Sequence, residues 1–373
     1  MKRTLLLLIF THVLIGQAPS GYYNATMGLS GTALQEALHD IIDDHNQQSY
    51  TALWTHFQAT DKKPNGKVWD MYSDVPGGSP AYEFTFGVDQ DNGTGGTAEG
   101  QKYNREHSWP RSWFATSSTS KNYPMYSDLF HLVPSDKFVN AQRANFPYGE
   151  VNSPTWTSTN GSKLGANTYP GYTGTVFEPI DAYKGDFARG YLYMTTRYLN
   201  EDTGWEGSPM TNGAQLQSWA LNLILDWHGA DTVSQKEIDR NNAIYGIQGN
   251  RNPFIDHPEF ADIIWRGGAP VSIEEMTAIS ISTFQLLPAF PNPFNGSTII
   301  SVHIPRTTPT SIDIFDLQGK WVSNITDQTL TTGEYQFFWS GQDHQEQDLA
   351  SGIYLIRVSS ADRQEFQRIT LLR

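Results

Sequence analysis

The spacing of apolar residues changes near residue 266, and this change constrains the fold more than any other feature. Before it, apolar residues recur at helical spacing, as at Leu34, Leu38 and Ile41. The expected helices are residues 32–45, 49–57, 187–200, 212–228 and 234–245. Beyond it, short runs alternate between apolar and polar residues, as in strands. These runs are residues 299–304, 311–315, 335–339, 352–358 and 365–371. We therefore expect two units: a large α+β domain and a small β-domain.

Glycine and proline mark the boundary between the two units. Residues 267–270 read Gly-Gly-Ala-Pro, and further prolines follow at 288, 291 and 293. We assign residues 19–266 to the first domain, 267–288 to a linker and 289–373 to the second. About seven short strands in the second domain predict a small Ig-like β-sandwich.

The first residues have the pattern of an export signal. Lys2 and Arg3 precede an apolar run at residues 5–15, and small residues follow up to Ala18. We assign residues 1–18 to a signal peptide. The apolar run is too short to cross a bilayer, so we expect export through the periplasm, no stable membrane span and a monomeric protein.

The chain has no cysteine, which excludes disulfides, thiolate nucleophiles and cysteine-ligated zinc. A metal site must use histidine, carboxylate and amide ligands, and these favour Mg²⁺, Ca²⁺ or Mn²⁺. The net charge of −14 argues against a phosphate-bearing partner. The acidic excess is unevenly distributed, however. Residues 60–145 hold 9 basic and 10 acidic residues, whereas residues 146–284 hold 8 basic and 16 acidic residues.

One stretch carries the residue types that phosphodiester hydrolysis needs. It begins with Asn104-Arg105-Glu106-His107 and continues through residues 127–145. A neutral histidine can accept a proton from water, and a divalent cation on hard oxygen ligands can stabilise the phosphate and the leaving group. His107 is the candidate base, while Glu106 and Asn140 offer the oxygen ligands.

The second half of this stretch predicts a helix over residues 136–145, with Ser135 as its N-cap. Asn140 and Arg143 then share one face, and residues 138 and 139 face the core. Glu106 and His107 are neighbours on a strand and would point to opposite faces. They can converge only where the strand ends, so we expect irregular backbone at residues 106–109.

Residues 22–266 resemble the bacterial endonuclease I family, whose nucleases have a ββα-metal core. The matching stretches are residues 69–72, 103–114, 128–150 and 226–256. The resemblance implies that His107 is the general base and that Glu106 and Asn140 bind one Mg²⁺ or Ca²⁺ ion. It also implies cleavage of DNA, with RNA as a second candidate, to leave 5′-phosphate ends.

This sequence departs from the family at two places. Phe130 stands where many relatives have the first of two histidines, which leaves His131 alone. The cysteine-containing insertion that carries a phosphate-contacting arginine in some relatives is missing. Arg143, Arg111 and Arg251 are the candidates to replace that arginine, and Arg143 fits best because it shares a face with Asn140.

Several neighbours of the motif have candidate supporting roles. Asp128 can orient His131 or cap a turn, and His131 can support the base. Trp109 and Trp113 are candidates for stacking on bases.

The C-terminal domain resembles the sorting domain of the type IX secretion system. The resemblance rests on residues 290–295, 314–320, 349–354 and 369–373. It implies the secretion machinery as a partner and a secreted or cell-surface location.

The sequence thus predicts a secreted, metal-dependent endonuclease: a ββα-metal core surrounded by helices and followed by a β-sandwich. The alternative is an inactive extracellular adhesin or carbohydrate-binding protein on the same scaffold, which the acidic charge and Phe130 would suit. A hydrolase acting on other phosphoesters or on cell-wall material is a third reading.

Overall fold

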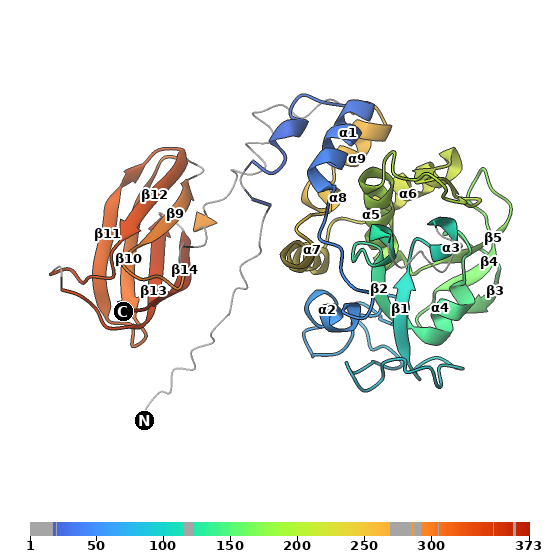
Figure 1. Cartoon of the computed structure of the whole chain (residues 1–373), viewed down its shortest axis with the longest axis horizontal. Helices are drawn as coiled ribbons and strands as arrows, with labels where there is room; N and C mark the ends of the chain where they lie inside the picture. Colours follow the sequence, from blue (N-terminus) through green and yellow to red (C-terminus); the bar gives the residue numbers. More distant parts are fainter. Residues whose placement is uncertain are drawn as a thin grey trace. The chain divides into compact units, whose positions relative to one another are not determined.

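The computed structural model shows a chain that folds into two compact units, Met1–Pro270 and Val271–Arg373 (Figure 1). The structure describes residues 18–19, 21–114, 123–268, 285–286, 289, 292–304, 306–345, 347–360 and 363–373. The predicted signal peptide, apart from Ala18, and most of the predicted linker lie outside the described residues. No helix in these ranges is long and apolar enough to cross a membrane.

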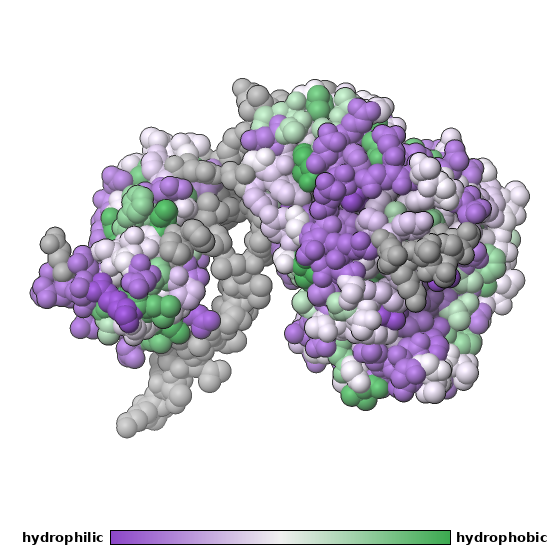
Figure 2. Space-filling model, in the orientation of Figure 1, coloured by the Kyte–Doolittle hydropathy of each residue, from purple (hydrophilic) through white to green (hydrophobic). Residues whose placement is uncertain are grey.

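The first unit combines helices with small sheets. Its helices are η1 (Asn24–Thr26), α1 (Gly31–Ile42), α2 (Leu53–Thr60), α3 (Arg111–Phe114), η3 (Pro124–Tyr126), α4 (Lys137–Arg143), α5 (Asp181–Arg197), α6 (Ser218–Ala230), α7 (Gln235–Gln248), α8 (Pro253–Asp256) and α9 (Phe260–Trp265). Its strands are β1 (Tyr103–His107), β2 (Leu132–Asp136), β3 (Pro154–Thr157), β4 (Lys163–Ala166), β5 (Thr175–Glu178), β6 (Thr211–Asn212) and β7 (Gln215–Leu216). Hydrophilic residues dominate the face that Figure 2 shows.

Helix α5 forms the centre of this unit. Its residues from Phe187 to Arg197 are all buried, so the helix is covered on every side. It packs against α1 and α6. The predicted helix over residues 212–228 begins only at Ser218, because residues 211–216 form the short β6–β7 hairpin around Gly213.

Strands β1 and β2 pair antiparallel, and α4 follows β2 without a loop (Figure 1). The register pairs Glu106 with Val133 and His107 with Leu132, without a bulge. The prediction of irregular backbone at residues 106–109 is therefore wrong for Glu106 and His107. The chain leaves the strand only at Ser108.

The N-cap of α4 is Asp136, one residue later than predicted. One carboxylate oxygen of Asp136 accepts hydrogen bonds from the backbone N–H groups of Phe138 (2.7 Å) and Val139 (3.0 Å). Ser135 lies inside β2 and donates its hydroxyl to the carbonyl of Asp136. Val139 is buried as expected, whereas Phe138 is half-buried and faces Trp156.

The described part of the second unit has strands and connecting turns and no helix, which confirms a strand-rich C-terminal region. The strands are β8 (Gln285–Leu286), β9 (Thr298–Ile304), β10 (Thr308–Asp316), β11 (Trp321–Leu330), β12 (Gly333–Trp339), β13 (Gly352–Ser360) and β14 (Arg363–Leu371). They form two sheets, in the orders β11-β10-β13-β14 and β12-β9-β8. Both sheets contribute to one buried apolar cluster, for example through Ile300 and Ile356.

We expect Asp136→Ala to lower the free energy of unfolding of the first unit by about 1–2 kcal/mol, the usual effect of losing an N-cap. The measurement is urea denaturation followed by tryptophan fluorescence. Ser135→Ala is the matched control and should have a smaller effect, because Ser135 makes only a 3.4 Å hydrogen bond. A larger loss from Ser135→Ala would show that the serine stabilises the helix start.

Candidate active site

The two faces of β1 carry different chemistry. Asn104 and Glu106 point toward α4: the Asn140 amide donates to the Asn104 Oδ1 atom at 2.8 Å, and an Arg143 nitrogen lies 3.1 Å from the Glu106 carboxylate. Arg105 and His107 point the other way. The Arg105 guanidinium and the His107 ring both pack on the Tyr50 ring. The structure thus brings Glu106, Asn140 and Arg143 to one face and places the His107 imidazole on the other.

Glu106 is a buried carboxylate held by two neighbours. Its Oε1 atom lies 3.1 Å from Arg143 and accepts a 3.2 Å hydrogen bond from the Tyr72 hydroxyl. Burial raises the pKa of Glu106 to about 7, although the charge of Arg143 and the hydrogen bond from Tyr72 favour the carboxylate. A divalent cation beside Glu106 would favour the charged form further.

The donor atoms on this face suit a hard divalent cation. Within the described part of the chain, Glu106 Oε2 and Asn140 Oδ1 accept no hydrogen bond, because the contacts of these residues use Oε1 and Nδ2. Carboxylate and amide oxygens are the ligands that Mg²⁺ and Ca²⁺ prefer. The expected ligand pair therefore has the right chemistry.

His107 is half-buried in an aromatic setting. Its ring stacks on Tyr50 with centroids 5.8 Å apart and also contacts Phe114, Tyr126 and His131. Burial lowers the pKa of His107 well below its ordinary value, and the neighbouring His131, Arg111 and Arg105 lower it further. The imidazole is therefore neutral at pH 7.

The tautomer of His107 follows from its hydrogen bond. Its Nε2 atom lies 3.1 Å from the backbone carbonyl of Tyr126. A carbonyl can only accept, so Nε2 carries the proton and Nδ1 keeps the lone pair. The basic nitrogen of His107 is thus Nδ1.

Arg143 is fully buried and holds groups of the protein itself. Its guanidinium contacts Glu106, the backbone carbonyls of His107 and Ser108, and the Tyr191 hydroxyl. Burial would lower the pKa of Arg143, but Tyr148 and Glu106 raise it, so the group stays charged. A phosphate could reach Arg143 only if these contacts broke. The structure therefore does not support the predicted contact between Arg143 and the phosphate.

The other two candidate arginines lie in different surroundings. Arg251 is buried and makes a two-pronged pair with Asp256 at 2.7 Å, so it belongs to a structural network. Arg111 is exposed at the start of α3, and its charge acts on His107. Of the three, Arg111 is the one that is exposed beside the predicted base.

The supporting residues are more deeply buried than expected for direct contact with a substrate. Asp128 accepts hydrogen bonds from the Tyr193 and Tyr198 hydroxyls. His131 is fully buried, bonds the carbonyl of Met125 and lies 5.5 Å from the His107 ring. Trp109 and Trp113 are 0% and 3% exposed, so the suggestion that they stack on bases is wrong for this conformation.

The sequence reasoning did not identify two tyrosines that surround Glu106. Tyr72 bonds Glu106 and also lies 2.7 Å from the Tyr148 hydroxyl, and the Tyr148 ring lies under the Arg143 guanidinium. The sequence signal was that Tyr72 and Tyr148 both lie in stretches that match the family, residues 69–72 and 128–150.

A cleft of about 720 Å³ opens elsewhere on the first unit. None of the predicted site residues lines it. Its charged lining includes both signs, with Lys63, Lys236, Asp74, Glu83 and Asp186. A cleft with this mixed charge does not favour a phosphate-bearing ligand over other ligands.

Two sequence families match the chain. The model of the Endonuclease I family matches residues 30–259, and that of the secretion system C-terminal sorting domain matches residues 288–371. Among solved structures, the dimeric latent PorU of Porphyromonas gingivalis is similar over 24% of this chain and 9% of its own, with 18% identity and a TM-score of 0.21.

Several of the similar proteins are named as extracellular nucleases. The chain is 34% identical over 264 residues to an extracellular ribonuclease of Bacillus amyloliquefaciens, a match that covers 65% of this chain and 78% of that protein. An extracellular ribonuclease of Bacillus subtilis (strain 168) is 34% identical over 255 residues, with the same coverage. An extracellular deoxyribonuclease of Aeromonas hydrophila is 28% identical over 132 residues, covering 35% of this chain and 50% of that protein.

We expect Arg143→Ala to lower the free energy of unfolding by about 3–5 kcal/mol, because it leaves Glu106 and two carbonyls buried without their partner. Urea denaturation measures this loss. Arg111→Ala is the control, and its effect should stay within about 0.5 kcal/mol because Arg111 is exposed. Equal stability of the two variants would show that Arg143 is not the anchor of this site.

Proposed function

Because this chain belongs to the endonuclease I family, we propose that it is a non-specific endonuclease that uses one divalent cation and the general base His107. It hydrolyses phosphodiester bonds in DNA and RNA and leaves 5′-phosphate ends. The observation that carries this proposal is the joint placement of Glu106 and Asn140 where β1 faces α4. The His107 imidazole lies on the opposite face of β1, so its role as the base rests on the family resemblance.

The family assignment and the nuclease names of its relatives support the enzyme over the alternative of an inactive adhesin or carbohydrate-binding protein on the same scaffold. The sorting domain and the extracellular relatives place it outside the cell or on its surface. The sorting domain also implies the secretion machinery as a partner.

Both nucleic acids are proposed as substrates because the relatives differ in name. The two Bacillus proteins are called ribonucleases and the Aeromonas protein a deoxyribonuclease. The described part of the site offers phosphate chemistry and no helix suited to reading base edges, so sequence preference should be slight.

The β1–β2–α4 unit is our candidate for the ββα-metal core. In support, the two strands pair antiparallel and α4 follows directly from Asp136. The two sheets of the second unit, which share one apolar cluster, support an Ig-like sandwich in the same way. We retain residues 1–18, 19–266, 267–288 and 289–373 as the proposed signal peptide, catalytic domain, linker and sorting domain.

In the proposed mechanism His107 removes a proton from the attacking water. The Tyr126 carbonyl fixes Nε2 as the protonated nitrogen, so Nδ1 accepts the proton. The lowered pKa of His107 keeps the imidazole ready to accept a proton at neutral pH. The contacts with Tyr50 and Phe114 hold the ring in one orientation.

Glu106 and Asn140 would hold the divalent cation through Oε2 and Oδ1. When bound, the cation supplies positive charge for the phosphate and the departing alkoxide. Arg143 and Tyr72 fix Oε1 of Glu106 and so orient its second oxygen. We therefore assign Arg143 as a positioning residue and Arg111 as the arginine that contacts the phosphate.

We expect His107→Ala to reduce cleavage of plasmid DNA in Mg²⁺ by about 10²–10⁴-fold, the usual effect of removing a general base. Agarose gel electrophoresis over time measures the rate, and a chelator should abolish cleavage by the unaltered protein. His56→Ala is the control, since His56 lies on α2 and bonds Gln48. Undiminished cleavage by His107→Ala would remove His107 from the mechanism.

The pH profile should depend on the Mg²⁺ concentration. A base works above its pKa, so at saturating Mg²⁺ the lowered pKa of His107 should keep activity high to below the ordinary histidine value of about 6.5. At limiting Mg²⁺ the activity should already fall near pH 7, because protons compete with the cation at Glu106, whose pKa is raised to about 7. Initial rates between pH 5 and 8 measure the profile at both Mg²⁺ concentrations. A loss of activity toward acidic pH that does not depend on Mg²⁺ would contradict Glu106 as a ligand.

A further inference from the structure

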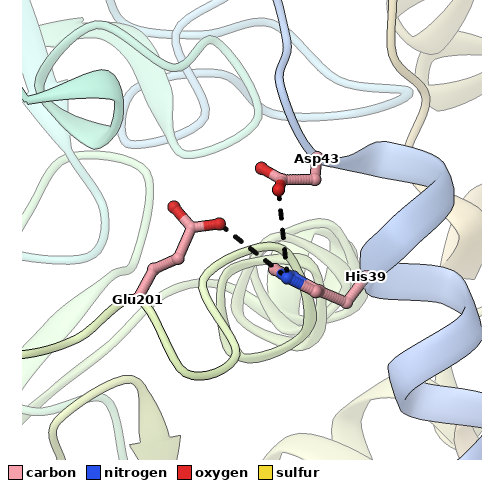
Figure 3. Close-up of side chains that lie close together, drawn as sticks. All are labelled: His39, Asp43 and Glu201. Carbon is pink, nitrogen blue, oxygen red and sulfur yellow. Dashed lines mark ion pairs between the residues drawn. The ribbon is translucent and has the colours of Figure 1, made fainter.

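Three potential metal ligands converge at the C-terminal end of α1. His39 lies in the last turn of α1, Asp43 caps that helix, and Glu201 lies in the segment after α5 (Figure 3). One ligand atom from each of these residues lies within 4.8 Å of the others. None of the three belongs to the proposed active site.

The His39 ring is oriented as in many metal sites. Its Nδ1 atom lies 3.2 Å and 3.0 Å from the carbonyl oxygens of Thr196 and Arg197. These oxygens only accept, so Nδ1 carries the proton and the lone pair of the neutral ring is on Nε2. Metal-binding histidines commonly donate a hydrogen bond from the N–H of their other ring nitrogen to a carbonyl in this way.

The lone pair of Nε2 faces two carboxylates, as Figure 3 shows. The distances are 4.0 Å to Asp43 and 3.8 Å to Glu201. A direct charged hydrogen bond would be about 2.7–2.9 Å long. Ligands of a tetrahedral zinc ion, each about 2.0–2.2 Å from the metal, lie roughly 3.4 Å apart. The observed spacing is closer to that of ligands around an ion.

Arg197 is the competitor for the same carboxylates. Its NH1 nitrogen lies 2.6 Å from Asp43 Oδ1 and 2.9 Å from Glu201 Oε1. Asp43 pairs with Arg197 through Oδ1 and turns Oδ2 toward His39, so its ion pair and a metal bond use different oxygens. The Glu201 oxygen nearest His39 is the Oε1 that also pairs with Arg197, so Glu201 would share this oxygen between Arg197 and the ion or use its other oxygen. The positive charge of Arg197 weakens cation binding, but it also holds both carboxylates in place. We therefore expect an exchangeable ion.

We propose that His39, Asp43 and Glu201 form a binding site for a zinc-class divalent ion that joins the end of α1 to the segment after α5. One imidazole and two carboxylates suit Zn²⁺, whereas Mg²⁺ and Ca²⁺ prefer ligand sets made of oxygen alone. Because the ion would bind only the folded chain, it would stabilise the first unit.

The test is a calorimetric titration of the whole, chelator-treated protein with ZnCl₂, accompanied by thermal unfolding. The unaltered protein should bind Zn²⁺, and at excess Zn²⁺ its Tm should rise by roughly 5 °C. His39→Ala should bind one Zn²⁺ ion fewer or bind it at least about tenfold more weakly. His56→Ala is the matched histidine control and should titrate like the unaltered protein.

Glu201→Gln is the second variant, because a side chain that is 34% exposed can be replaced without disturbing the core. It should lose the same Zn²⁺ ion and keep its circular dichroism spectrum. Cleavage of plasmid DNA in Mg²⁺ by His39→Ala should be unchanged, which separates this site from the proposed active site. Zinc binding by His39→Ala and Glu201→Gln that equals the unaltered protein, or an unchanged Tm, would overturn the proposal.

Discussion

The buried ion pair between Arg143 and Glu106 fixes how α4 lies against β1. A guanidinium without exposure needs several acceptors, and Arg143 finds them in Glu106 and in the carbonyls of His107 and Ser108. These carbonyls lie at the point where β1 ends, so one side chain holds both the helix and the end of the strand. The positions of Asn140 on α4 and of His107 on β1 both depend on this contact.

The alternation of side chains along β1 separates two buried environments that shift pKa values in opposite directions. On the α4 face, burial raises the pKa of Glu106, and on the aromatic face it lowers the pKa of His107. Both shifts favour the neutral form, because an uncharged group is less costly to bury. A neutral histidine is what a general base requires, whereas a ligand carboxylate must be charged. In the proposed mechanism, binding of a cation would therefore charge Glu106 and leave His107 neutral.

The sequence predicted the elements more successfully than it predicted the partners of charged side chains. Helical spacing located α1, α5 and α7, and alternation located β9, β10, β12, β13 and β14. It missed β11, whose polar residues Asn324, Asp327 and Gln328 hide the alternation. Ser135 and Asp136 are both good caps, so only the structure distinguishes them. The burial of Arg143 could not be predicted, because its partners Glu106 and Tyr191 lie far away in the sequence and meet it only after folding.

Much of the positive charge of the first unit is used inside the protein and is not available to attract a polyanion. Several arginines of this unit are buried and paired with internal carboxylates, so they contribute little field outside. These pairs are Arg189 with Glu237, Arg240 with Asp61, and Arg251 with Asp256. The net charge of −14 therefore opposes long-range attraction of nucleic acid. The segment around the site is nearly balanced in charge, and Arg111 is exposed there. In the proposed mechanism the attraction would be local, from Arg111 and a bound cation, as suits an enzyme that contacts one phosphate and few others along the strand.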